Sequence, residues 1–191
     1  LFFIILGILS LTLLFQTNPL TIKISLFFAF LIILYPLTKR FFVAPQFILG
    51  ITFGSGSIIA YSLESNIFSI SLVILYSGII AWIISFDTYY ALEDKNDDEK
   101  IGVNSTAILW GNNAIIYSKI LHLFFYVCLL AIGLINSFSY LFYILFFVLI
   151  YLFIYQAKII KEKKYIEAFK INNWIGIASL IIFAVEIIYL S

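Results

Sequence analysis

The feature that most constrains this chain is a series of apolar runs, each long enough or nearly long enough to cross a lipid bilayer. A membrane-spanning helix needs roughly 20 predominantly apolar residues. Because lipid offers no hydrogen-bond partners, only helices or closed barrels satisfy their backbone there, and these runs lack the alternation of barrel strands. The sequence therefore predicts an all-α integral membrane bundle. Seven candidate spans follow one another, at residues 1–15, 21–38, 43–62, 67–87, 113–135, 138–157 and 173–190.

Composition agrees with a membrane protein and excludes other classes. The chain is 64% hydrophobic and 11% charged, whereas a soluble domain carries about 25% charged residues. Its net charge of +1 argues against a nucleic-acid partner, which requires a basic surface. Cys128 is the single cysteine, so the chain can form neither an internal disulfide nor a cysteine metal site.

The positions of the basic residues predict how the bundle is oriented. Successive spans cross the membrane in opposite directions, so the segments after the second, fourth and sixth runs lie at the same end. These segments and their flanks contain ten of the 11 Lys and Arg residues, and Lys23 is the exception. Basic residues accumulate on the cytoplasmic side of membrane proteins. We therefore expect this end to face the cytoplasm from a bacterial inner membrane, or the matrix from a mitochondrial one.

One polar island, residues 87–100, holds six of the chain's ten acidic residues. If the fourth helix continues through it, Asp87, Asp94 and Asp98 fall within about 40° of one another, with Asp97 beside Asp94. Aligned carboxylates repel one another unless a cation lies between them, and oxygen ligands alone suit Mg²⁺. Mg²⁺ commonly binds one or two carboxylates together with a substrate phosphate. The spacing thus favours a Mg²⁺ site for a lipid diphosphate, although a solvated charged loop also accounts for it.

Two further polar features accompany the island. Lys39 and Arg40 belong to the same end by topology and could bind the outer oxygens of a diphosphate, with Arg acting as a bidentate fork. Ordinary positive charge flanking a span explains them as well. Pro36, just before them, predicts a kink or an end to the second helix. Glu186, near the outer end of the last run, is a candidate functional acid, but we expect it to reach water.

Three stretches together resemble a known family. Residues 87–98 (DTYYALEDKNDD), continued by 101–107 (IGVNSTA), closely resemble the second aspartate-rich motif of UbiA-type aromatic prenyltransferases. They are most similar to the 4-hydroxybenzoate polyprenyltransferase branch. Residues 35–41 (YPLTKRF) with Pro45 and Gln46 resemble its basic turn, and residues 172–176 (NNWIG) resemble its last-helix entrance.

The resemblance implies an activity and assigns roles to residues. It implies Mg²⁺-dependent transfer of a polyprenyl chain from polyprenyl diphosphate to the ring carbon ortho to the hydroxyl of 4-hydroxybenzoate, a step of ubiquinone biosynthesis. The partners are these two substrates and the lipid bilayer, with no obligate protein partner. The implied metal ligands are Asp87, Asp94, Asp97 and Asp98. The implied diphosphate-binding residues are Tyr35, Lys39 and Arg40, of which Lys39 and Arg40 stabilise the leaving group.

The resemblance also implies a nine-helix bundle with two aspartate-rich loops over a central cavity. The first of these motifs and the first two helices are absent here, and the chain contains no Met. We therefore expect residues 1–191 to be an N-terminally truncated single membrane prenyltransferase domain, with seven of nine helices and no activity alone. The alternatives are a relative with another aromatic acceptor, a CDP-alcohol phosphotransferase (whose D-G-x-x-A-R signature is absent), or a non-enzymatic cation-binding membrane protein.

Overall fold

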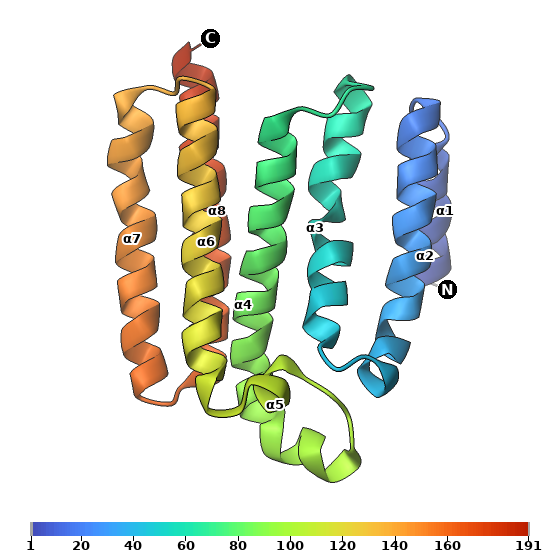
Figure 1. Cartoon of the computed structure of the whole chain (residues 1–191). Helices are drawn as coiled ribbons and strands as arrows, with labels where there is room; N and C mark the ends of the chain where they lie inside the picture. Colours follow the sequence, from blue (N-terminus) through green and yellow to red (C-terminus); the bar gives the residue numbers. More distant parts are fainter. Residues whose placement is uncertain (1, 191) are drawn as a thin grey trace.

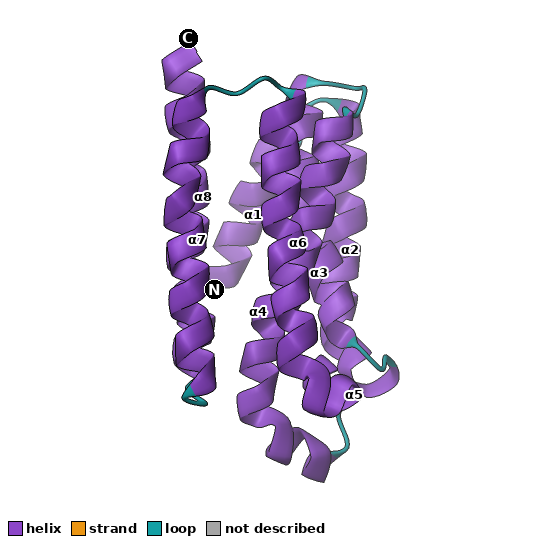
Figure 2. Cartoon of the chain, turned by 60° about the vertical axis from the view of Figure 1, so that its left-hand side comes forward, coloured by secondary structure: helices purple, strands orange, loops and turns teal. Residues whose placement is uncertain are grey.

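The computed structural model describes residues 2–190, and within them the chain is helical throughout apart from short connections (Figure 2). The side chains of residues 3, 39, 189 and 190 lie outside the described part. This arrangement confirms the predicted all-α class. The elements are α1 (Phe2–Leu14), α2 (Pro19–Phe41), α3 (Pro45–Glu64), α4 (Ile70–Ile101), α5 (Thr106–Trp110), the 3₁₀ turn η1 (Gly111–Asn113), α6 (Ala114–Ile135), α7 (Tyr140–Lys161) and α8 (Tyr165–Leu190).

Six stretches of the described chain are long and apolar enough to cross a membrane. They correspond to α2, α3, α4, α6 with the preceding α5, α7 and α8, while α1 contributes a shorter apolar helix over Ile4–Leu14. Each of the seven predicted runs therefore becomes a helix. The chain is an integral, multi-pass membrane protein.

The long helices run antiparallel to their sequence neighbours, so that the connections alternate between two ends (Figure 1). The connections that follow α2, α4 and α7 share one end, which is the lower end in Figure 1. This grouping confirms the prediction that they lie at the same end. We call this the charged end, because it carries Arg40, the last turns of α4 and the α7–α8 turn around Glu162 and Lys164, which form an ion pair of 2.9 Å.

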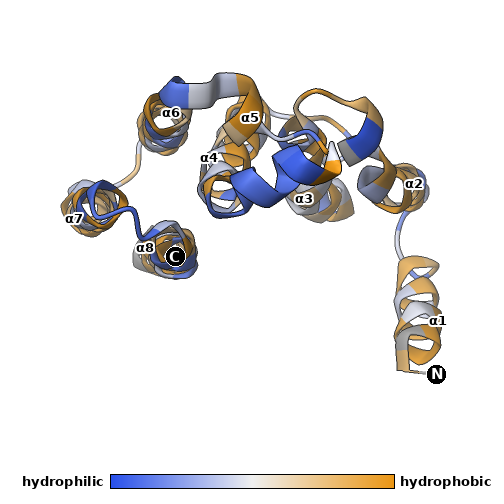
Figure 3. Ribbon diagram, turned by 90° about the horizontal axis from the view of Figure 1, so that it is seen from below, coloured by the Kyte–Doolittle hydropathy of each residue, from blue (hydrophilic) through white to orange (hydrophobic). Residues whose placement is uncertain are grey.

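Viewed along their axes, α4, α3 and α2 form the middle of a curved arrangement, with α6, α7 and α8 beyond α4 and α1 beyond α2 (Figure 3). Glycines allow close approach between the helices. A Cβ added at Gly50 of α3 would lie 3.0 Å from the carbonyl oxygen of Ile80 in α4. A Cβ added at Gly78 of α4 would lie 2.8 Å from the Cβ of Cys128 in α6. The packing of α3 on α4, and of α4 on α6, therefore depends on glycines that leave room for the neighbouring helix.

Several helices extend beyond their apolar runs. Pro36 does not end α2, which continues to Phe41 and is closed by a 2.7 Å hydrogen bond from the amide of Phe42 to the carbonyl of Thr38. Helix α7 reaches Lys161, and α8 begins at Tyr165. Lys and Glu are good helix formers in water, so the backbone stays helical where the apolar pattern stops.

Candidate functional site

Helix α4 carries the acidic island as an uninterrupted continuation of its membrane span. Its 32 residues end at Ile101, where Gly102 adopts a left-handed conformation with φ of 72° and its amide binds the carbonyl of Asp98. The assumption behind the predicted spacing is therefore correct: the island is helix. Because helix periodicity is intact, Asp87, Asp94 and Asp98 share one face of α4. We call these three residues the acidic row.

The acidic row follows, along α4, a segment that lines an apolar cavity. Ile83 and Phe86 of α4 line a pocket of about 270 Å³ between α3, α4 and α8. Asp87 comes four residues after Ile83, one turn closer to the charged end. A second pocket of about 290 Å³, almost entirely apolar, extends the first between α4, α6 and α8. We call the two pockets the trough; they share Ile79 and Trp82.

The four predicted metal ligands do not form one cluster. Among the described residues, no three His, Cys, Asp or Glu side chains lie close enough to hold a metal ion. Asp87 and Asp94 are separated by two helical turns, about 10 Å along the axis. Asp97 is exposed and forms a 2.9 Å ion pair with Lys100. The arrangement offers carboxylates singly or in adjacent pairs, and this oxygen-only donor set fits Mg²⁺ that is shared with a phosphate.

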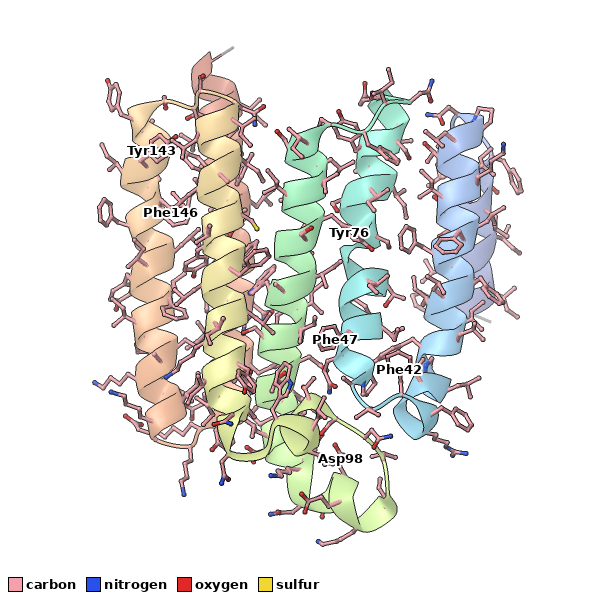
Figure 4. All side chains as sticks on the ribbon, in the orientation of Figure 1. Phe42, Phe47, Tyr76, Asp98, Tyr143 and Phe146 are labelled. Atoms are coloured by element: carbon pink, nitrogen blue, oxygen red, sulfur yellow. The ribbon has the colours of Figure 1, made fainter. Side chains whose placement is uncertain are left out.

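The predicted basic side lies at the same end of the bundle. Tyr35 is half-buried in α2, about one turn before the basic residues at the end of that helix. Arg40 is exposed in the last turn of α2, whereas the side chain of Lys39 lies outside the described residues. Figure 4 shows Phe42, just beyond α2, and Asp98 of α4 at this same end.

A buried junction beside Asp87 was not predicted. The side-chain oxygen of Gln46, at the start of α3, accepts a 2.9 Å hydrogen bond from the amide of Thr106, the first residue of α5. The hydroxyls of Thr106 and Thr88 lie 2.7 Å apart. All three residues occur in the motif-like stretches of the sequence, which gave them no role. The junction joins α3, α4 and α5 at the charged end.

Helix α8 closes the trough through its residues 172–176. These residues lie inside α8, not at its start. The side-chain oxygen of Asn172 accepts a 2.9 Å hydrogen bond from the indole of Trp82, and its amide group donates to the carbonyl of Phe169 at 3.0 Å. The Trp82 ring stacks on Phe125 with ring centres 4.9 Å apart. Three helices thus fix the position of this wall.

Glu186 does not reach water as expected; its exposed fraction is 1%. One carboxylate oxygen accepts the backbone N–H of Ser139, and the other accepts its hydroxyl, both at 2.6 Å. Ser139 is the residue that precedes α7. A carboxylate is stabilised at a helix N-terminus by the helix dipole. Glu186 therefore fastens the end of α8 to the start of α7, far from the acidic row.

A bundle of apolar helices, in which α4 provides a wall of the trough and carries a row of carboxylates nearer the charged end, defines a polytopic membrane protein. Comparison with known proteins agrees with this class. The chain belongs to the UbiA prenyltransferase family, whose sequence model matches residues 1–183.

Similar proteins include two curated enzymes and one solved structure. The chain is 34% identical over 180 residues to the 4-hydroxybenzoate octaprenyltransferase of Saccharophagus degradans, covering 93% of this chain and 60% of that protein. It is 37% identical over 174 residues to the enzyme of the same name from Francisella tularensis subsp. novicida, covering 90% and 60%. The apo structure of a UbiA homolog from Aeropyrum pernix K1 has a TM-score of 0.75 at 20% identity, covering 90% of this chain and 66% of that one. The chain thus spans about 60% of the length of these curated relatives.

Proposed function

We propose that this chain acts in the transfer of a polyprenyl chain from polyprenyl diphosphate to the ring carbon ortho to the hydroxyl of 4-hydroxybenzoate. The observation that carries the proposal is that α4 provides both a wall of the apolar trough and, nearer the charged end, the acidic row. An isoprenoid diphosphate has the matching division into apolar tail and anionic head. The aromatic acceptor, and with it a place in ubiquinone biosynthesis, is inferred from the relatives named 4-hydroxybenzoate octaprenyltransferase.

The trough binds the isoprenoid tail. Apolar surface removed from water contributes about 25 cal/mol per Å², and the walls formed by Ile79, Trp82 and Phe86 offer such surface. Exclusion of water from these walls also protects an allylic cation from capture before the ring attacks. The same walls therefore serve both binding and the selectivity of the reaction.

The charged end acts on the diphosphate. In this proposal Asp94 and Asp98 as an adjacent pair, and Asp87 singly, would hold Mg²⁺ that is shared with the diphosphate, with Asp97 assisting after release from Lys100. When bound, Mg²⁺ supplies positive charge that offsets the negative charge of the diphosphate. Lys39 and Arg40 bind the outer diphosphate oxygens by charge-assisted hydrogen bonds, and the Tyr35 hydroxyl donates to the same group.

The bond changes balance without a further reactant. The allylic C–O bond breaks, and its electron pair leaves with the diphosphate. The ring carbon ortho to the phenol hydroxyl supplies the electrons of the new C–C bond, and the proton on that carbon passes to the released diphosphate or to water, which restores the aromatic ring. Groups that already face the diphosphate stabilise its developing charge without reorganising, which lowers the barrier.

The proposed setting is a bacterial inner membrane, with the charged end toward the cytoplasm. The test uses membranes from a bacterial strain that lacks its own 4-hydroxybenzoate prenyltransferase and expresses the complete gene that contains the sequence of residues 1–191. Labelled 4-hydroxybenzoate, homogentisate or 1,4-dihydroxy-2-naphthoate is supplied with polyprenyl diphosphate and Mg²⁺, and products are separated by chromatography. We expect prenylation of 4-hydroxybenzoate alone. Preference for another acceptor would place the protein in another branch of the UbiA family. The absence of transfer to any acceptor would overturn the proposal in favour of a cation-binding role.

A further inference from the structure

We propose that Gln46, Thr88 and Thr106 are positioning residues that hold the acidic row of α4 at a fixed separation from the basic end of α2. The inference rests on the proposed function, because it concerns the two sides of the same diphosphate site. We call these three residues the lock. Their exposed fractions are 3%, 0% and 0%, so water does not compete for their hydrogen bonds.

The hydrogen bonds of the lock have a defined direction. The Thr88 hydroxyl donates to the carbonyl of Ile84, one turn earlier in α4, at 2.6 Å. A hydroxyl has a single proton to donate, so in the 2.7 Å contact between the two hydroxyls Thr106 is the donor and Thr88 the acceptor. The backbone N–H of Thr106 donates separately to Gln46. Thr106 therefore gives two hydrogen bonds, one to α3 and one to α4.

The location of these bonds connects the two charged sides. Thr88 follows Asp87 directly, so the hydroxyl contact fixes α4 beside the first acid of the row. Gln46 is the second residue of α3, six residues after Arg40 and just beyond the turn that ends α2. Thr106 therefore binds both the start of α3, which follows the basic end of α2, and the helix that carries the acids.

The separation between the acidic row and the basic end of α2 matters because the inferred diphosphate site is formed by both helices. Mg²⁺ requires nearly ideal octahedral geometry, and functional groups must be held within about 0.5 Å of their productive positions. Because the acidic row is part of a continuous helix, any slip of α4 along α3 displaces all its carboxylates together. Loss of the lock should therefore weaken binding of Mg²⁺ and diphosphate, while the aromatic acceptor, which carries no diphosphate, is affected little.

A purely structural role makes a different prediction, and Thr106→Val separates the two. This variant removes the donor hydroxyl but leaves the Thr88 proton bonded to Ile84, so no buried donor loses its partner. Thr88→Val, in contrast, leaves the Thr106 hydroxyl unpaired in the interior, which destabilises the fold. In the double variant Thr88→Val/Thr106→Val both partners become apolar groups of similar shape, and stability should return. Thr106→Ser keeps the hydroxyl and serves as the matched control.

The experiment measures stability, binding and turnover on the same purified protein in detergent. We expect Thr106→Val and the double variant to unfold at temperatures close to that of the unsubstituted protein. Both should show an apparent KM for polyprenyl diphosphate, and a Kd for inorganic pyrophosphate in Mg²⁺, raised about tenfold, as loss of one hydrogen bond implies. The KM for 4-hydroxybenzoate should stay unchanged, and Thr106→Ser should match the unsubstituted protein.

Unchanged diphosphate KM and pyrophosphate Kd in both stable variants would overturn the positioning role. So would a loss of affinity that follows only the unfolding temperature across the whole series, because that is the behaviour of a structural contact. If the unsubstituted protein transfers no prenyl group, the proposed function fails, while calorimetry with Mg²⁺ and pyrophosphate still decides the role of the lock.

Discussion

The indole N–H of Trp82 donates a 2.9 Å hydrogen bond to the side-chain oxygen of Asn172, which joins α4 to α8 at the wall of the trough. Asn172 is itself held by donation to the carbonyls of Ala168 and Phe169, at 3.2 and 3.0 Å. Hydrogen bonds within α8 therefore orient the Asn172 side chain toward the indole of Trp82. The shape of the trough depends on this contact, since Trp82 lines both of its pockets.

Replacement of Asn172 by Leu should destabilise the bundle. It leaves the Trp82 N–H without an acceptor beside an apolar cavity, and an unpaired buried donor costs about 1–3 kcal/mol. Thermal unfolding in detergent measures the loss. The matched control is Asn173→Leu, because Asn173 lines the same pocket but is exposed. Equal effects of the two substitutions would contradict a specific role for the contact.

Removal of one acid from the row should abolish the proposed reaction without disturbing the fold. Asp94→Ala is expected to lower Mg²⁺-dependent prenyl transfer at least about a hundredfold, as loss of a group that stabilises transition-state charge typically does. Glu93→Ala is the control, since Glu93 is the neighbouring acid, is exposed and lies on another face of α4. Membrane insertion, measured by fractionation, should be normal in both. Full activity of Asp94→Ala would refute its assignment as a metal ligand.

Gly78→Ala should separate α4 from α6. The added Cβ would lie 2.8 Å from the Cβ of Cys128, closer than real side chains approach, and such overpacking costs about 1–3 kcal/mol. At Gly56 of α3, in contrast, an added Cβ meets nothing within 4 Å, so Gly56→Ala gains helix propensity at no steric cost. Unfolding temperatures of the two variants should therefore shift in opposite directions, and a common shift would argue against close packing at Gly78.

Glu186→Leu should loosen the far end of the bundle. Ser139 then loses both of its carboxylate acceptors, and we expect a loss of about 2 kcal/mol in the free energy of unfolding. Glu186→Gln should recover most of this loss, because its amide oxygen can still accept the Ser139 N–H. Hydrogen exchange over the first turn of α7 provides the local measurement. Similar exchange in the Leu and Gln variants would show that Glu186 does not cap that helix.

Helix positions could be predicted from hydrophobicity, but helix ends could not. The runs at 138–157 and 173–190 stop where Lys appears, yet α7 and α8 continue to the tight turn at residues 162–164. Hydrophobicity reports where lipid is in contact, whereas backbone hydrogen bonds decide where a helix ends. Helix α5 has only five residues, too few for periodicity to reveal, and is capped by the side chain of Ser105.

For the candidate site, sequence spacing predicted which side chains share a face of one helix, but it did not predict which side chains of different helices are in contact. The common face of Asp87, Asp94 and Asp98 followed from helical geometry once α4 proved continuous. Gln46 and Thr106 are 60 residues apart in sequence, and no local pattern connects an amide side chain with a distant backbone N–H. The pairing of Asp97 with Lys100 shows a further limit, because side chains three residues apart on a helix bind one another as readily as a metal.

The uninterrupted helix through residues 87–101 limits which genetic changes this region can accept. Substitution at one acid removes one charge and leaves the others in place. Insertion of a single residue after Asp87 would rotate every later carboxylate by about 100° about the helix axis and carry it about 1.5 Å away. Length variation among relatives should therefore be rare before Gly102 and freer at residues 103–104, where the chain is no longer helical. An alignment gap within the island would mark a relative whose site is built differently.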